Sequence, residues 1–417
     1  MTSLLTDIEP ILKPIFVDNL PEMGFDETVT WGMLNKIVDF KGREKWLPMK
    51  IGRTPGVSHS FARAQANAGA SRYSRWELTR SKSYGVVQFD GEEYEAAESP
   101  GAQVDYVVDE VKGAMASMQH RLNRMLFRNH GGAFARLLAA GAGGGTATIT
   151  VQDPLDLIGI DVGMFIVTSN TDGTSGSVDA NPTEIGAIDR IAGTLTTVSG
   201  NWNAVAGFSD NDYLFVDGDF GLGVYGLPEW LPASAPASTA FFGVDRTADS
   251  LRLGGQRVEA LAADGTLSRF FDRAMTEMYL QGARNARTII MNPRHVSQVR
   301  DETNNKTDWQ KIPGRTSQGA SAEIGYDALK ILTDNGSAML VGDRDCPLHV
   351  AYALDMSTCD WHGLKSAGPR ILDYGGGQYL RMAAEDSLEG RLGWRGQFAI
   401  REPGKCGRFD LSELTDT

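Results

Sequence analysis

Cysteine is scarce in this chain of 417 residues, and long apolar runs are absent. Three cysteines clustered near the end of the sequence cannot form a disulfide framework, so we expect a reducing compartment; they are Cys346, Cys359 and Cys406. No stretch approaches the roughly 20 consecutive apolar residues of a membrane-spanning helix, so we expect no membrane association. Asp7, Glu9 and two prolines interrupt residues 1–16, which argues against a secretory or transit segment.

Basic side chains are also scarce, and they are unevenly distributed. Lys and Arg number 40 against 53 Asp and Glu, and the formal net charge of −13 excludes nucleic-acid binding through the whole surface. Residues 141–245 contain thirteen acids and one base, Arg190, and residues 91–110 contain seven acids and no base. Residues 41–90 instead carry ten bases and three acids, a net +7. Unlike patches on one chain favour contacts between identical copies, although solvated faces of a monomer explain the same pattern.

Motifs of known catalytic chemistry are missing or lack their structural context. The sequence has no Gly-x-Ser-x-Gly and no His-Glu-x-x-His. Residues 221–226 have the glycine spacing of a dinucleotide-binding loop, but Pro228 and Pro232 exclude the helix that such a loop must open. The favoured interpretation is therefore a structural turn, and we predict no catalytic residues and no cofactor.

Two cysteine–histidine pairs have the residue types of a zinc site, Cys346-x2-His349 and Cys359-x2-His362. The sequence between the pairs predicts a strand, which holds them roughly 23 Å apart. Buried cysteines and hydrogen-bonded histidines are the favoured interpretation, so we predict no metal site.

The first half of the chain predicts an arm, a ribbon and a long helix. Residues 1–40 contain three prolines among short apolar groups, which indicates an extended arm. Residues 45–90 alternate like strands, notably 72–78 and 84–89, and favour a two-stranded ribbon with a basic surface. Apolar residues spaced by three and four then predict a helix around 104–128, ended by Gly131-Gly132. Arginines in its last turns complement the helix dipole; they are Arg121, Arg124 and Arg128.

The second half begins with a glycine-rich hinge containing Gly143, Gly144 and Gly145. Short β runs between 146 and 216 predict a small antiparallel barrel or sandwich that extends to about 236 and is inserted in the chain. Thr266 caps a predicted amphipathic helix, and Asn292-Pro293 opens a shorter one. Further strands are expected at 328–332, 338–341, 349–354, 378–383 and 390–400.

The order of these parts resembles the major capsid proteins of tailed bacteriophages, whose fold herpesvirus shells share. Short stretches at 242–247, 291–293, 324–327 and 351–355 resemble sequence segments of this family. The resemblance implies an α+β fold with an N-terminal arm, an extended β-hairpin loop, a peripheral domain with a long spine helix, an axial domain and an inserted small antiparallel β-barrel. The implied boundaries are 1–40 for the arm, 41–97 for the extended basic loop, 98–140 for the spine helix, 141–236 for the insertion, 237–290 for the peripheral domain continued, 291–375 for the axial domain and 376–417 for the return to the peripheral domain.

The resemblance also implies a function. It predicts a non-enzymatic virion protein that assembles in the host cytoplasm, as hexamers and pentamers, into an icosahedral shell around double-stranded DNA without sequence-specific binding. Its partners would be further copies, a separate scaffolding protein, a portal and decoration proteins. The alternatives are a nanocompartment shell of the same fold, or a β-rich adhesive or carbohydrate-binding protein built around residues 141–236.

Contacts between subunits are expected from the charge pattern and the resemblance together. The predicted contact residues are Arg63, Arg72, Arg75, Trp76, Arg80 and Lys82 in the basic loop, and Glu92, Glu93, Glu95 and Glu98 in the acidic stretch. Arg121, Arg124 and Arg128 are alternatively predicted to touch packaged phosphates.

Overall fold

The computed structural model describes residues 28–90, 106–138, 147–179, 181–202, 205, 207–304, 329–333, 336–372, 379–382 and 387–415. The predictions for residues 1–27, for Glu92, Glu93, Glu95 and Glu98, and for the hinge at Gly143, Gly144 and Gly145 lie outside this part of the chain. The chain divides into two compact units. Of the described residues, the smaller unit comprises 84–90, 106–118, 369–372, 379–382 and 387–393, and the larger unit comprises all the others.

The smaller unit is built on one long strand, the first part of β19 (Ser387–Ile400). Three strands pair with β19, namely β4 (Ser81–Asp90), β17 (Arg370–Ile371) and β18 (Tyr379–Arg381). Val87 and Phe89 of β4 are buried, while the alternate residues Val86 and Gln88 are exposed. The first part of helix α5 (Tyr106–Met125) belongs to this unit and confirms the predicted long helix. The strands expected at 378–383 and 390–400 are also confirmed.

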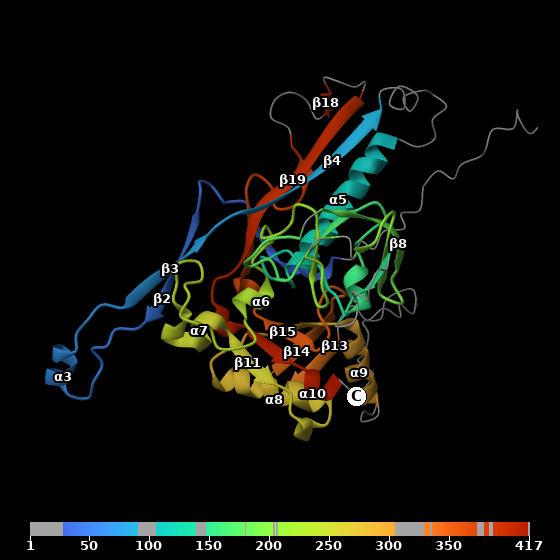
Figure 1. The fold of residues 1–417 in the computed structure, drawn as a ribbon. Helices are drawn as coiled ribbons and strands as arrows, with labels where there is room; N and C mark the ends of the chain where they lie inside the picture. The colour runs from blue at the N-terminus through green and yellow to red at the C-terminus, as the bar shows by residue number, and fades with distance from the viewer. Residues whose placement is uncertain are drawn as a thin grey trace, which may run out of the picture. The chain divides into compact units, whose positions relative to one another are not determined.

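The larger unit contains a mixed sheet covered by helices (Figure 1). Across the sheet the order is β11 (Gln256–Glu259), β20 (Gly407–Asp410), β15 (Val350–Leu354), β12 (Thr288–Met291), β14 (Gly336–Gly342) and β13 (Leu329–Thr333). The helices α8 (Leu267–Leu280) and α9 (Pro293–Asn304) pack on it and bury Phe270, Met278 and Val299 against the strands. Both helices begin where the sequence predicts. The Thr266 hydroxyl accepts a hydrogen bond from Arg269 N, and the Asn292 side chain accepts one from Arg294 N.

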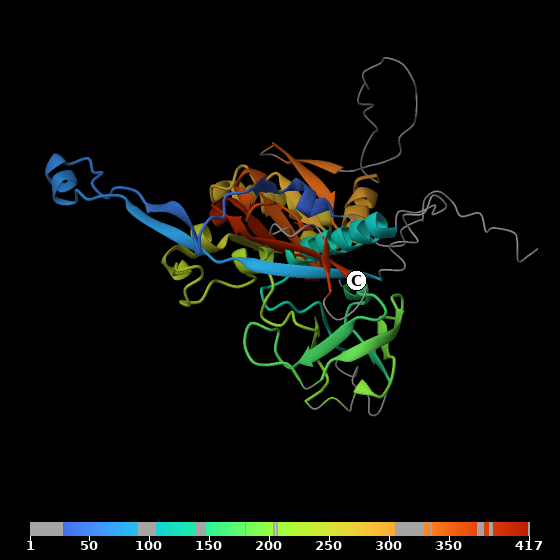
Figure 2. The same cartoon turned by 90° about the horizontal axis from the view of Figure 1, so that it is seen from above.

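The β-rich block of the larger unit forms a second, antiparallel sheet (Figure 2). Its order is β5 (Ala135–Arg136), β10 (Tyr213–Val216), β7 (Phe165–Ser169), β8 (Thr183–Asp189), β9 (Thr194–Thr197) and β6 (Thr148–Thr150). The two outer strands also meet, because Leu137 pairs with Val151 and Leu138 N donates to Thr150 O. Trp202 lies in its apolar core, fully buried. The predicted strands of this block are confirmed, whereas the short β5 was not predicted from the sequence.

The β2–β3 hairpin of the larger unit differs from the predicted ribbon. Strand β2 (Lys45–Gly52) pairs with β3 (Arg72–Leu78), and the six-residue helix α3 (Phe61–Ala66) lies between them. The predicted strand at 84–89 does not belong to the hairpin, since it is part of β4, which pairs with β19. Alternation of side chains identifies a strand but not its partner, which explains the error.

Residues 28–40 also correct an expectation, because they pack instead of forming an extended arm. Helix α2 (Val29–Met33) is followed by β1 (Asn35–Ile37), which pairs in parallel with β16 (Cys359–Gly363). Trp31 and Phe40 are buried, and the Trp31 ring lies 5.0 Å from that of Trp361. Burial of two large aromatic side chains fixes this segment to the larger unit.

The glycine-rich segment 221–226 packs along the end of α5, which stops at Met125, before the predicted Gly131-Gly132. Gly223 N and Leu227 N donate to carbonyl oxygens of His130 and Leu126 beyond the helix. A Cβ at Gly226 would lie 2.6 Å from Leu126 O, so close backbone packing requires glycine there. A one-turn helix, α6 (Leu227–Trp230), follows, so Pro228 does not prevent a helix; proline is tolerated in a first turn. Within the described residues, none of the helices combines the length and apolarity that a membrane crossing requires.

Candidate assembly surface

The hairpin projects from the rest of the larger unit, with α3 at its tip (Figure 1). Its ladder is antiparallel from Lys45 opposite Leu78 to Gly52 opposite Arg72, with an irregularity between Lys50 and Gly52. Helix α3 has no buried residue, and the apolar side chains of Val57 and Phe61 at the tip are 83% and 81% exposed. An exposed apolar tip on a two-stranded hairpin buries little within its own chain, which favours burial against another molecule.

One face of the hairpin carries alternating aromatic and cationic side chains. The Arg75 guanidinium lies 3.7 Å from the centre of the Trp46 ring, and the Lys50 amine lies 5.9 Å from the Tyr73 ring. Trp46 is 53% exposed and Tyr73 is 71% exposed. Cation–π pairs of this kind orient the cations along the strand and leave apolar surface for a partner.

Trp76 is placed differently from its predicted role as a contact residue. It is fully buried at the root of the hairpin, 5.2 Å from the Trp230 ring and 6.1 Å from the Phe241 ring. Next to it, Glu77 N donates to Phe242 O at 2.9 Å. Trp76 therefore anchors the hairpin to its own chain and is not available to a neighbouring subunit. Successive side chains of a strand point to opposite faces of the sheet, so Trp76 lies on the face opposite to that of Arg75 and Glu77.

The remaining predicted cations are spread along the hairpin and β4. Arg63 is exposed on α3, and Arg72 is exposed at the start of β3. Arg75 pairs with Glu77 at 3.0 Å. Arg80 is half-buried, with its guanidinium 5.3 Å from the Phe40 ring, and Lys82 is exposed on β4. The structure brings Arg72 and Arg75 together on one strand, while Arg63 lies at the tip.

The arginines at the end of α5 have partners inside the chain, which argues against the phosphate contacts predicted for them. Arg124 is buried and donates to Ile158 O at 2.7 Å and Phe134 O at 2.9 Å. Burial lowers the pKa of Arg124 to about 10, so the side chain stays charged at neutral pH. Arg121 pairs with Asp219, and Arg128 pairs with Asp156. Backbone carbonyls and carboxylates of the inserted sheet thus take the place of phosphate partners.

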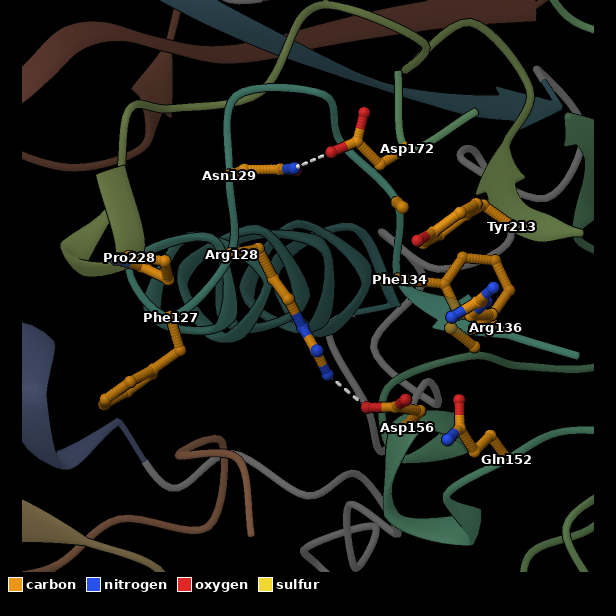
Figure 3. A pocket seen from close by; sticks show the side chains of 12 residues that line it. Phe127, Arg128, Asn129, Phe134, Arg136, Gln152, Asp156, Asp172, Tyr213 and Pro228 are labelled. Carbon is orange, nitrogen blue, oxygen red and sulfur yellow. Dashed lines mark hydrogen bonds and ion pairs between the residues drawn. The ribbon is translucent and has the colours of Figure 1, made fainter. Parts of the chain in front are cut away.

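A cavity of about 310 Å³ lies where α5 meets the inserted sheet. Figure 3 shows Arg128 directed at Asp156 and Asn129 directed at Asp172, which accepts a hydrogen bond at 2.7 Å. Arg136, also at its wall, lies over the Tyr213 ring. Two pairs of its polar side chains, Arg128 with Asp156 and Asn129 with Asp172, neutralise or satisfy each other, so its geometry fits a structural junction better than a catalytic centre.

The cysteines and histidines weighed as a zinc site are separated by β15, as the sequence predicted. Cys346 and Cys359 are buried, and burial raises the pKa of the Cys346 thiol well above its usual value. His349 Nδ1 lies 2.5 Å from the Thr415 hydroxyl, and His362 Nδ1 lies 2.9 Å from Asp39. Over the described ranges, no three histidine, cysteine or acidic side chains are grouped as metal ligands.

Comparisons with known proteins agree with this fold. No family model and no curated protein matches the sequence. The capsid asymmetric unit of cyanophage A-1(L) is similar at 14% identity with a TM-score of 0.54, covering 96% of this chain and 97% of that one. The capsid of a native GTA particle is similar at 10% identity with a TM-score of 0.50, covering 99% of both chains. An encapsulin complex from Synechococcus elongatus PCC 7942 aligns at 8% identity with a TM-score of 0.46, covering 97% and 94%. The first two similarities extend over nearly all of both chains and confirm the predicted resemblance in fold.

Proposed function

We propose that this chain, which has the α+β fold of tailed-phage capsid proteins, is a major capsid protein that assembles into an icosahedral shell around double-stranded DNA. It is a structural protein of the virion, and its main partner is a further copy of itself, in hexamers and pentamers. Fold alone does not specify function, so the proposal depends on a surface feature of this chain.

The hairpin is the observation that carries the proposal. Its tip exposes Val57 and Phe61, and one face exposes Trp46 and Tyr73 between cations. Such a surface is costly in a monomer and useful in a shell, where one contact is repeated in every subunit. The charge distribution supports the same proposal, because the net +7 of residues 41–90 complements the acidic residues 141–245 of another copy.

The proposed shell requires accessory proteins and must enclose DNA without holding it. A separate scaffolding protein, a portal and decoration proteins would complete the particle, which would assemble in the host cytoplasm. The net charge of −13 suits an enclosing wall, since a negative wall does not hold DNA that must later be released.

Reversing two exposed charges of the hairpin tests the proposal. Arg63→Glu with Arg72→Glu should prevent particles while leaving the unfolding temperature of the subunit unchanged, because neither side chain has an ion pair within the described residues. Arg80 is left unchanged because it lies over the Phe40 ring. Arg269→Glu with Arg300→Glu, two exposed charges outside the hairpin, is the matched control. Normal particles from the hairpin variant, seen by negative-stain microscopy, would contradict the proposed role.

A further inference from the structure

A cleft of about 680 Å³ lies beneath the hairpin, wholly within the larger unit. One wall is the outer part of β2 and its continuation, residues 49–54. The opposite wall is formed by α7 (Ser250–Gly254), the end of α8 and the turn 401–405. Arg252 Nη1 donates to Ile51 O at 3.4 Å and so connects the two walls.

The cleft is strongly cationic. Five basic side chains line it, against one carboxylate, Glu402; they are Lys50, Arg53, Arg252, Arg401 and Lys405. Three of them already have acidic partners, since Arg252 pairs with Asp249, Arg401 with Asp360 and Lys405 with Glu402.

Lys50 and Arg53 have no carboxylate partner in the described part of the chain, and both are exposed on the hairpin wall. Met49, Ile51 and Leu251 supply apolar surface between the charges. The cleft therefore offers two unneutralised cations beside an apolar floor, which suits an acidic segment with one or two larger side chains.

The charges of the chain discriminate between possible occupants. The tip of a neighbouring hairpin carries Arg63 and no acid, so the cleft repels it. Residues 91–98, Gly-Glu-Glu-Tyr-Glu-Ala-Ala-Glu, carry four glutamates, one tyrosine and no base. Four glutamates within eight residues give this segment enough negative charge to pair with both unneutralised cations.

We propose that this cleft binds the acidic segment 91–98 of a second copy, with Lys50 and Arg53 pairing to Glu93 and Glu95. The inference rests on the proposed shell function and specifies one of its contacts. Beyond the general complementarity between the basic and acidic parts of the sequence, it specifies a binding cleft beside the hairpin.

Cross-linking between two distinguishable copies tests the contact directly. One version of the full chain carries Arg53→Cys, and a second version with a mass tag carries Glu95→Cys; the native cysteines are all buried. Particles co-assembled from both are treated with a short bismaleimide. We expect a covalent dimer whose mass is the sum of the tagged and untagged chains. Arg43→Cys in place of Arg53→Cys is the control, because Arg43 is exposed and lies outside the cleft, and it should give at least about tenfold less dimer.

Charge exchange provides an independent readout. Lys50→Glu with Arg53→Glu should abolish particles, and adding Glu93→Lys with Glu95→Lys should restore them. Lys41→Glu with Arg43→Glu changes the net charge equally outside the cleft and should assemble normally.

The outcomes separate this inference from the proposed function. The inference alone is overturned if the particles give no more mixed dimer than the Arg43→Cys control. It is also overturned if a chain that carries both Arg53→Cys and Glu95→Cys is cross-linked only within itself. Equal loss of particles from both charge variants also overturns it, because general charge would then matter and the cleft would not. An unchanged chain that forms no particles when it is co-expressed with the neighbouring proteins of its genome contradicts the proposed function itself.

Discussion

Trp46 and Trp76 lie on the two strands of one hairpin but in opposite environments. Trp46 pairs in register with Glu77, and Trp76 pairs with Leu47, so the two indoles point to opposite faces. Residues 45–78 have aromatic and aliphatic side chains on both faces of the hairpin. Alternation alone therefore did not identify the face that packs against the rest of the chain. The sequence therefore predicted the strands, while Trp76 was wrongly expected at a subunit contact.

Trp76→Ala should reduce the free energy of unfolding by about 3–5 kcal/mol, because a fully buried indole leaves a cavity against Trp230 and Phe241. Trp46→Ala is the matched control, and it should change stability by less than about 1 kcal/mol because its ring is half exposed. Urea denaturation of the unassembled subunit measures both values. Equal effects of the two substitutions would contradict the burial difference.

Asp345 makes the stability of the larger unit depend on pH. Burial by itself raises the pKa of this carboxyl, but hydrogen bonds with His120 and Asn123 outweigh it and hold the pKa below its usual value. When the pKa of a carboxyl is lower in the folded chain than in the unfolded chain, its ionised form stabilises the folded state. This contribution is complete at pH values above the unfolded pKa of about 3.9, and it is lost as the pH falls through the folded pKa.

Asp345→Asn should therefore lose stability relative to the unchanged chain at neutral pH, and the difference should shrink between about pH 5 and pH 2. Asp217→Asn, at an exposed carboxyl, is the control and should leave the stability at neutral pH unchanged. Thermal unfolding across this pH range is the measurement. A stability difference for Asp345→Asn that stays constant with pH would contradict the assignment.

At the scale of elements, local signals predicted helices well and strand partners poorly. Thr266 and Asn292 correctly located the starts of α8 and α9, because a cap is a contact within a few residues. The pairing of β4 with β19 joins segments about 300 residues apart, and no local pattern encodes such a partner. For the same reason, the packing of residues 28–40 on β16 was not predicted.

The junction between α5 and the inserted sheet depends on Arg124. The sequence suggested compensation of a helix dipole, but this guanidinium is buried and satisfies carbonyl oxygens of Phe134, Asp156 and Ile158. Arg124→Met should cost about 3 kcal/mol or more, since it leaves these carbonyls without a donor. Arg136→Met, at an exposed position beside the same junction, should cost less than about 1 kcal/mol.

Limited proteolysis of Arg124→Met would show whether the inserted sheet becomes the first part to be cleaved. Resistance equal to that of the unchanged chain would refute the role of Arg124 at this junction.

At the scale of the whole molecule, charge and exposed apolar surface support the same function. The net charge of −13 combines a basic stretch at 41–90 with the acidic residues 91–110 and 141–245. The structure places part of the basic stretch on a hairpin that exposes the aromatic side chains of Trp46, Phe61 and Tyr73. Neither property alone distinguishes a shell subunit from a monomer, but both on a chain with a capsid fold favour repeated contact between copies.

Imaging the full-length chain by cryo-electron microscopy, after co-expression with the neighbouring proteins of its genome, tests the central claim most directly. We predict closed shells with fivefold vertices, in which each hairpin lies against an adjacent subunit. A chain that stays monomeric in that setting, or whose shells enclose an enzyme and neither scaffolding protein nor DNA, would contradict the proposed capsid function.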